Sequence, residues 1–312
     1  MALDTTAVEV GSSRGDIDTS LNYYLDPALG GHSSFEAGTA GYFRRKFDER
    51  PVRIHDIRGH SDDFDVSKQG FQLVKHTSVE KEYLSDKEVK RIVYPEVEKL
   101  LKKVTGATRV HVFSHITRRD SRDKLELDLQ KNSAIQNGAK VTQVTPAHYI
   151  HIDQSTDGAL EVLCDNMPAA EVDQLVKTRW SIINVWRPIN GPVIKDPLAV
   201  CDARTVRDDE LIPVTANLPA KGTGMKYSTI TAGKRFELFY AKYNPEHQWY
   251  YASGMTSDEV LLIKCFDSIS DGETARRVPH SAFIDPKTKD LDLVRESVEV
   301  RSLVFYEDQP NE

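Results

Sequence analysis

The sequence has 312 residues, of which 39% are hydrophobic and 29% are charged, a composition typical of a globular protein with a full hydrophobic core. Its 41 Lys and Arg residues are outnumbered by 48 Asp and Glu residues, so the formal net charge is −7 at pH 7. A protein that binds phosphates of nucleic acid normally has a basic surplus. The charge balance therefore argues against nucleic acid as the main partner.

Two features indicate the cellular compartment. The first residues are acidic and small where a signal peptide would have a basic and then an apolar segment, and no stretch approaches the ~20 apolar residues of a membrane span. The three cysteines, Cys164, Cys201 and Cys265, form no CxxC pair and leave one cysteine over, which suits a reducing cytosol. We therefore expect a cytoplasmic protein that does not enter a membrane.

The N-terminal part of the chain changes character after about twenty residues. Residues 1–20 are small and polar without periodicity, which predicts a flexible tail. Residues 51–56 alternate between apolar and polar side chains as a half-buried strand does. We interpret residues 21–312 as a single domain.

A helix is predicted in the next part of the chain. Ser85 and Glu88 form a capping box, in which each side chain satisfies a free backbone N–H group. Apolar residues then recur at helical spacing up to Gly106, a typical residue after a helix end. Pro95 lies inside this run and predicts a kink, because proline lacks the N–H group that a helix needs.

The remaining elements are predominantly strands. A short helix is predicted over residues 168–178, where Pro168 stands near the start. Segments rich in β-branched and aromatic residues indicate strands over residues 108–115, 180–187, 236–242, 248–252, 259–266 and 295–306. The predicted fold is mainly β with flanking helices, most simply around a double-stranded β-helix, the jelly-roll or cupin-like core.

The segment Tyr149-Ile150-His151-Ile152-Asp153 contains two candidate metal ligands. Alternate residues of a strand share a face, so His151 and Asp153 would point to one side, with Tyr149 beside them as a candidate substrate contact. Two His and one carboxylate on one octahedral face leave three positions open, which suits iron(II) that also binds a co-substrate and dioxygen.

His280 is the natural third ligand. It follows Pro279, and the residue before a proline is extended by steric preference, which suits a ligand at the start of a strand. The long segment between His151 and His280 must contain other core strands and an insertion. His247 is the competitor, but it follows Asn244 and Pro245 in what reads as an exposed turn.

An arginine beyond the third ligand indicates the co-substrate. Arg295 and Ser297 follow His280 after a loop, and a guanidinium matches a carboxylate such as the distal one of 2-oxoglutarate. Arg301 has the same parity, so Arg295, Ser297, Glu299 and Arg301 would share a face, with valines on the other. One arginine would hold 2-oxoglutarate and the other would pair with Glu299 or a substrate carboxylate. We favour Arg295 because Ser297 accompanies it.

A further polar segment adds three candidates. Asn184 is a candidate for the co-substrate site. Trp186 is either a core aromatic residue or a substrate contact, and Arg187, before Pro188, is either a substrate contact or part of a buried ion pair. The sequence alone leaves these alternatives open.

Several short segments occur in a fixed order around the metal motif: residues 56–59, 70–74, 105–107, 184–188, 262–268 and 297–301. In this order the chain, over roughly residues 50–306, resembles the fungal hydroxylase/desaturase family of iron(II)/2-oxoglutarate-dependent oxygenases. That family is similar to gibberellin desaturase, to CmcJ-like proteins and to aziridine-forming oxygenases.

The resemblance implies a reaction class and its cofactors. The implied cofactor is Fe(II), and the implied co-substrates are 2-oxoglutarate and O2. 2-Oxoglutarate would be converted to succinate and CO2 while the substrate is oxidised at a C–H bond, by hydroxylation, desaturation or ring closure. The substrate would be a small-molecule metabolite of secondary metabolism, with carboxylated compounds as candidates. Two alternatives are a non-haem iron enzyme that does not use 2-oxoglutarate and a non-catalytic accessory subunit. The oligomeric state stays open, with a homodimer as one alternative.

Overall fold

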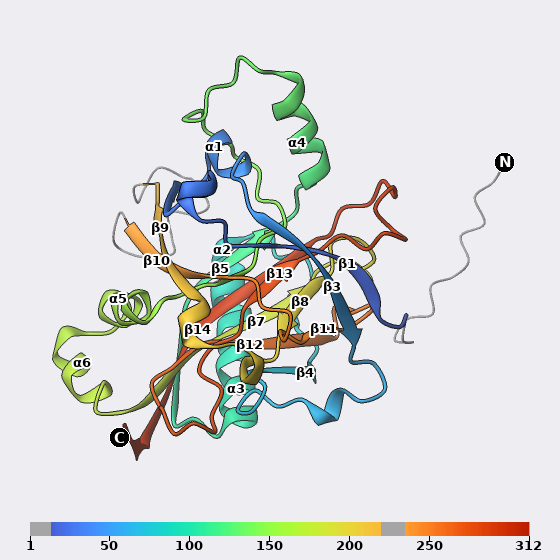
Figure 1. Ribbon diagram of the computed structural model, residues 1–312. Helices are drawn as coiled ribbons and strands as arrows, with labels where there is room; N and C mark the ends of the chain where they lie inside the picture. The colour runs from blue at the N-terminus through green and yellow to red at the C-terminus, as the bar shows by residue number, and fades with distance from the viewer. Residues whose placement is uncertain (1–13, 220–234, 312) are drawn as a thin grey trace.

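The computed structural model describes residues 14–219 and 235–311, which build two β-sheets (Figure 1). The larger sheet has the strand order β1-β3-β11-β8-β13-β6-β10-β9-β2, and the smaller has the order β4-β12-β7-β14-β5. The larger sheet comprises β1 (Ile17–Tyr23), β3 (Asp48–Asp56), β11 (Trp249–Tyr251), β8 (Leu198–Cys201), β13 (His280–Ala282), β6 (His151–Ile152), β10 (Arg235–Ala241), β9 (Leu211–Asn217) and β2 (Ser34–Glu36). The smaller comprises β4 (Phe71–Lys75), β12 (Glu259–Asp267), β7 (Thr178–Pro188), β14 (Ser297–Pro310) and β5 (Arg109–Arg118).

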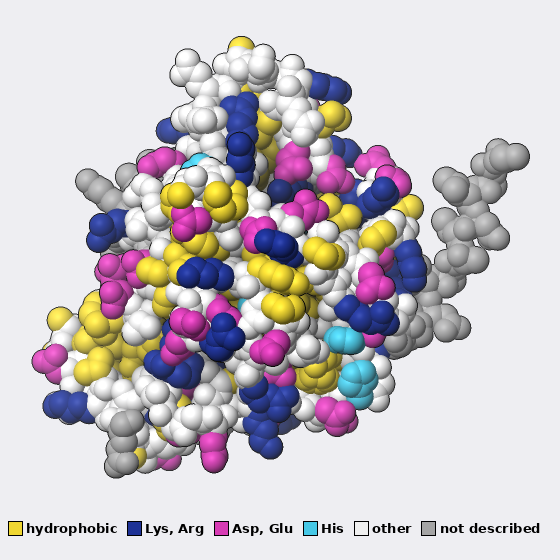
Figure 2. Space-filling view, in the orientation of Figure 1, with side chains coloured by type: hydrophobic (Ala, Val, Ile, Leu, Met, Phe, Trp, Pro, Cys, Tyr) yellow, Lys and Arg dark blue, Asp and Glu magenta, His cyan; other side chains and the backbone are white. Residues whose placement is uncertain are grey.

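Helices flank these sheets, and Figure 1 shows α4 as an extension beyond them. Their bounds are α1 (Ala40–Phe43), α2 (Asp86–Glu88), α3 (Tyr94–Thr105), α4 (Arg122–Lys131), α5 (Thr156–Asn166) and α6 (Ala169–Leu175). The mainly β jelly-roll architecture predicted from the sequence is confirmed. Among the described helices, none is long and apolar enough to cross a membrane. Figure 2 shows acidic and basic side chains interspersed over the face in view.

The two faces of β14 pack against different layers. Leu303 and Phe305 join the core that also contains residues of the larger sheet, whereas Val298, Val300 and Val304 join a second core beneath α3. A strand places alternate side chains on opposite faces. The predicted separation of the valine face from the face of Ser297, Glu299 and Arg301 is therefore confirmed.

The helical segment that begins after Ser85 shows how Pro95 is accommodated. The Ser85 hydroxyl accepts a hydrogen bond from the Glu88 N–H group, 3.4 Å away, as the capping box predicts. A π-helical turn, η3 (Val89–Val93), then separates α2 from α3. Pro95 stands in the first turn of α3, where its missing N–H group has no cost. Gly106 ends the helix with a φ of 72°.

The N-terminal boundary differs from the expectation. Residues 1–13 lie outside the described residues, but β1 already begins at Ile17 and pairs with β3. Ile17 and Leu21 are buried in the main core. The predicted tail over residues 1–20 is therefore too long, because this short strand is stabilised by pairing with a distant segment that local composition does not reveal.

The two strands that carry the candidate ligands are direct neighbours. His280 of β13 lies opposite His151 of β6 in an antiparallel pair, and β6 also pairs with β10. The segment between them supplies β7 to β12 and the helices α5 and α6. Folding therefore brings together two histidines that are far apart in the sequence.

Candidate active site

The side chains of His151, Asp153 and His280 converge inside the molecule. One potential ligand atom from each lies within 4.8 Å of the others, and all three residues are buried. The ring centroids of the two histidines are 4.5 Å apart, as expected for residues opposite each other on paired strands. Two imidazoles and one carboxylate in this arrangement are the donor set that non-haem iron(II) uses.

Backbone contacts select the nitrogen that each histidine presents. The Nδ1 atom of His151 lies 2.9 Å from the Tyr149 carbonyl oxygen, and the Nδ1 atom of His280 lies 3.1 Å from the Val278 carbonyl oxygen. A carbonyl oxygen only accepts hydrogen bonds, so both Nδ1 atoms must carry the proton. Both Nε2 atoms then have a free lone pair, as a metal ligand requires.

The Asp153 carboxylate is held in a similar way through one of its oxygens. Asn184 donates a hydrogen bond to Oδ2 over 2.6 Å, and the Arg301 Nε atom lies 3.3 Å from the same oxygen. Oδ1 lies 3.5 Å from the His151 Nε2 atom. One oxygen is thus fixed by the protein while the other faces the histidines.

The local electrostatics favour the metal-binding protonation states. Burial would raise the pKa of Asp153, but the positive charge of Arg301 and the neighbouring histidines outweigh it and hold the pKa well below its usual range. Burial lowers the pKa of His280 to about 4, and the nearby His151 contributes further. The carboxylate is therefore ionised and the His280 imidazole neutral near pH 7, and the donor set fits iron(II).

The guanidinium of Arg295 has one edge without a partner. Its Nη1 atom donates a hydrogen bond to the Asp196 carbonyl oxygen over 2.5 Å, and its Cζ atom lies 5.3 Å from the ring centroid of Trp186. Among the described residues, the buried Arg295 Nε atom and the buried Ser297 hydroxyl have no hydrogen-bond partner. Burial lowers the pKa of Arg295 to about 10, although Asp196 partly opposes this.

Arg301, the alternative, is already engaged. Its Nη2 atom lies 2.8 Å from a Glu299 carboxylate oxygen, and its Nε atom contacts both Glu299 and Asp153. Burial would lower the pKa of Arg301, but the two carboxylates outweigh it and raise the pKa above the ordinary value. Arg301 therefore serves as the counter-charge of Asp153 and Glu299.

A cavity opens beside the triad. His151, Asp153, Arg118 and Arg301 form its polar end. Most of its remaining wall is apolar or aromatic and includes Phe35, Tyr42, Ile116, Leu218, Phe236 and Leu238. Tyr149 also lines the cavity, and its ring centroid lies 4.7 Å from that of His151. A cavity of this composition suits a ligand with an apolar body.

Arg45 packs behind the wall of this cavity and is not among the residues predicted from the sequence. Its guanidinium lies 4.1 Å from the ring centroid of Tyr42, 4.2 Å from that of Phe35 and 4.5 Å from that of Tyr149. Its Nε atom donates a hydrogen bond to the Tyr42 carbonyl oxygen. The available signal is the interleaving of aromatic and basic side chains over residues 42–47, a pattern that favours cation–π contacts.

Three earlier candidates lie away from the cavity. Arg187 was predicted to contact the substrate, but its side chain lies on the face of β7 that points away from the cavity. There its Nη1 atom donates hydrogen bonds to the His76 and Ser257 carbonyl oxygens, both 2.9 Å away. Trp186 is buried in the core beneath Arg295 and does not line the cavity. His247 contacts Glu210 over 2.9 Å and is not part of the triad.

A jelly-roll core that carries a two-histidine, one-carboxylate triad near a buried arginine is the arrangement of iron(II)/2-oxoglutarate-dependent oxygenases. Comparison with known proteins agrees. A family model described as "Oxidoreductase/YMDC permease-like domain" matches residues 21–305. The hydroxylase/desaturase CTB9 of Cercospora beticola is 42% identical and the match covers 95% of this chain and 88% of CTB9. The alpha-ketoglutarate-dependent dioxygenase phiK of a fungal species is 34% identical and covers 95% of this chain and 99% of phiK.

A solved structure extends the similarity to three dimensions. The iron and alpha-ketoglutarate-dependent endoperoxidase NvfI superposes with a TM-score of 0.68 at 26% identity, over 94% of this chain and 99% of NvfI. The chain belongs to the fungal hydroxylase/desaturase family that the sequence motifs predicted. It is an iron(II)/2-oxoglutarate-dependent dioxygenase.

Proposed function

We propose that His151, Asp153 and His280 are the ligands of the iron ion. The observation that carries this assignment is that each residue has one polar atom held by the protein and another directed at the shared centre. The held atoms are Nδ1 of both histidines and Oδ2 of Asp153. Such outer contacts orient metal ligands and select their protonation states.

We assign the distal carboxylate of 2-oxoglutarate to Arg295 and Ser297. The free Nε edge of Arg295 and the free Ser297 hydroxyl offer donors that match a carboxylate. The hydrogen bond that Arg295 makes to Asp196 goes to the carbonyl oxygen, and the nearby acidic charges of Asp196 and Glu299 only partly offset the effect of burial. An incoming carboxylate would compensate the guanidinium charge further. Asn184 contacts Asp153, and Arg301 contacts both Asp153 and Glu299. In this proposal both are positioning residues that act on the site through these carboxylates.

The substrate, in this proposal, is a small molecule of secondary metabolism with an apolar body and an oxygen-rich or carboxylated end. The apolar walls would enclose the body, and the positive charges of Arg118 and Arg301 lie at the end next to the triad. When bound, iron(II) with 2-oxoglutarate and O2 supplies the oxidation of a substrate C–H bond, by hydroxylation, desaturation or ring formation. The protein positions the substrate and excludes water.

Substrate-dependent formation of succinate tests this proposal. We would screen apolar carboxylated metabolites and their amides against the iron-loaded protein with 2-oxoglutarate and O2. We expect acids to be turned over and amides to be disfavoured, because an amide lacks the negative charge that Arg118 and Arg301 would attract. Leu238→Trp should block turnover by filling the cavity, whereas Leu160→Trp, at an exposed position of α5, should not. Coupled turnover only with a protein or nucleic acid would contradict the proposal.

We further propose that the protein works in the cytoplasm. Cys164 is exposed, Cys201 and Cys265 are buried, and all are free thiols in the structure, which supports a reducing compartment. Microscopy of a fluorescently tagged chain tests this location, and a signal confined to an organelle or to the cell exterior would contradict it.

A further inference from the structure

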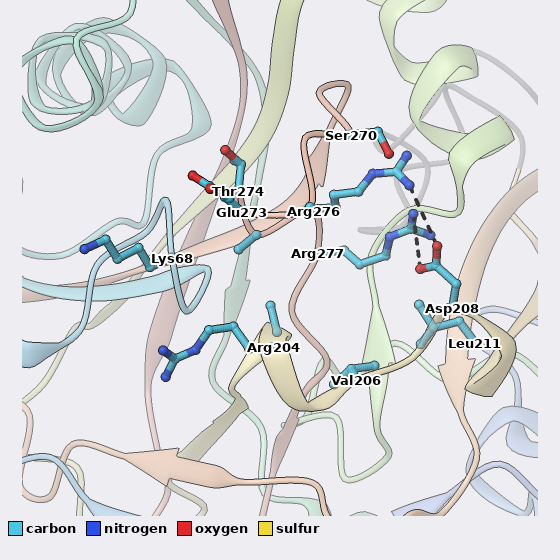
Figure 3. Close-up of a pocket in the computed structure, with 13 residues that line it drawn as sticks. Lys68, Arg204, Val206, Asp208, Leu211, Ser270, Glu273, Thr274, Arg276 and Arg277 are labelled. Atoms are coloured by element: carbon cyan, nitrogen blue, oxygen red, sulfur yellow. Dashed lines mark ion pairs between the residues drawn. The ribbon is translucent and has the colours of Figure 1, made fainter. Parts of the chain in front are cut away.

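A second cleft lies at the surface, apart from the cavity beside the His151–Asp153–His280 triad (Figure 3). Arg276 and Arg277 line it from the segment that leads to β13, and Asp208 lines it from the short 3-10 helix Asp208–Glu210. The cleft shares no lining residue with the cavity that contains His151 and Asp153. The two are therefore distinct places in the structure.

Two adjacent arginines in this cleft share a single acidic partner. Figure 3 shows both side chains pointing toward Asp208. The Arg276 Nη1 atom lies 3.8 Å from one Asp208 oxygen, and the Arg277 Nη2 atom lies 3.6 Å from the other. Both distances exceed that of a hydrogen bond, and the Asp208 side chain is 74% exposed. The carboxylate thus compensates two positive charges only weakly.

The inner edges of both guanidinium groups lack partners. Among the described residues, the Nε atoms of Arg276 and Arg277 are shielded from solvent and make no hydrogen bond. The Arg277 side chain is only 10% exposed, and its Cζ atom lies 5.3 Å from the ring centroid of Phe239. Burial lowers the pKa of Arg277, and the charge of Arg276 adds to this effect. A buried guanidinium whose charge is only weakly compensated is costly, so the arginine pair favours an anionic ligand.

The other basic side chains of the cleft are arranged differently. Arg204 is neutralised by Asp202, whose Oδ2 atom lies 2.6 Å from Nη2. In Figure 3, Arg204 and Lys68 extend away from the arginine pair. The unsatisfied donors are thus concentrated at Arg276 and Arg277, and Arg204 provides a matched control within the same cleft.

We propose that Arg276 and Arg277 form a binding site for a phosphate group, which replaces Asp208 as their acceptor. Each guanidinium can donate to phosphate oxygens through the Nη atom that now faces Asp208. A carboxylate has only two oxygens, whereas phosphate has enough oxygens and charge for both arginines. The phosphate is either the free ion or the ester group of a larger molecule, since both present the same oxygens.

Calorimetric titration of the full-length, iron-loaded protein with inorganic phosphate tests the site, at constant ionic strength and with 2-oxoglutarate saturating. Arg276→Ala and Arg277→Ala should each weaken binding by about tenfold or more, because each removes a charge-assisted pair. Asp208→Asn should strengthen it, since a competing anion is removed. Arg204→Ala should bind phosphate like the unmodified protein. Circular dichroism verifies that each variant is folded.

A second arm compares glycerol 3-phosphate with inorganic phosphate. Tighter binding of the ester would identify a phosphorylated molecule as the ligand, and tighter binding of the free ion would identify phosphate itself. Phosphate should also protect Arg276 and Arg277 from modification by phenylglyoxal, measured by mass spectrometry. Equal phosphate affinity of Arg277→Ala and Arg204→Ala, or weaker binding by Asp208→Asn, would overturn the proposal.

Discussion

Asn184 donates a hydrogen bond to one oxygen of the Asp153 carboxylate over 2.6 Å, and this contact leaves the other oxygen directed toward His151. The two residues come from different sheets, Asn184 from β7 of the smaller sheet and Asp153 from the residue after β6 of the larger one. The relative position of the sheets therefore determines the orientation of a proposed metal ligand.

Asn184→Leu should weaken iron(II) binding by about 10- to 100-fold, the range seen when a group behind a metal ligand is lost. The replacement is similar in volume but removes the Asn184 donor from Asp153 Oδ2, which keeps only the longer Arg301 contact. Anaerobic calorimetric titration with iron(II) measures the effect, with Asn132→Leu, at an exposed position, as the control. Equal iron affinity of the two variants would show that this contact does not orient Asp153.

The ligand strand and its partners could be predicted from the sequence because they depend on local pattern. The alternation around His151 and Asp153 indicates a shared face, and the same rule separates Ser297, Glu299 and Arg301 from the valines of β14. The same alternation along a strand predicts that Arg187 shares a face with Ile183 and Val185 and not with Asn184.

Other features depend on contacts between distant segments. The Arg45 site combines residues near position 45 with Tyr149 and Tyr240, and no local periodicity brings these together. A bulge where β14 pairs with β5 lies between Arg301 and Ser302, and it changes which β5 side chains face inward. After this bulge, His115 of β5 contacts Tyr94 of α3.

Lowering the pH should destabilise the metal-free protein below about pH 6.5. The folded-state pKa of His280 is about 4, against an ordinary value of 6.5, so the unfolded chain binds more protons between these values. At about 1.4 kcal/mol for each pKa unit, the loss from this group approaches 3 kcal/mol near pH 4. Urea unfolding from pH 7 to pH 4.5 measures it, with His280→Gln as the comparison. If the free energy of unfolding changed equally with pH in both proteins, the low pKa of His280 would not be the cause of the pH dependence.

Arg45→Met should lower the free energy of unfolding by about 2 kcal/mol or more, because buried cation–π contacts and hydrogen bonds to Tyr42 and Tyr240 are lost together. Arg50→Met is the control, since the Arg50 side chain is 47% exposed. Urea denaturation of both variants tests the difference. Equal stability would mean that the aromatic residues do not need the guanidinium.

Arg295→Ala should retain iron(II) but lose saturable binding of 2-oxoglutarate, because it removes the donors proposed for the distal carboxylate. Arg301→Ala should instead weaken iron binding, since Asp153 and Glu299 would lose their counter-charge. Titrations with iron(II) and then with 2-oxoglutarate separate the two effects. The reverse pattern in the two variants would assign the co-substrate to Arg301.

Anaerobic absorption spectroscopy tests the central claim most directly, because iron(II) chelated by 2-oxoglutarate has a weak metal-to-ligand charge-transfer band in the visible range. We predict that the unmodified protein develops this band when both are added, and that His280→Ala, which removes one of the three convergent ligands, remains folded without it. A band of equal intensity in His280→Ala, or no band in the unmodified protein, would contradict the iron site described here.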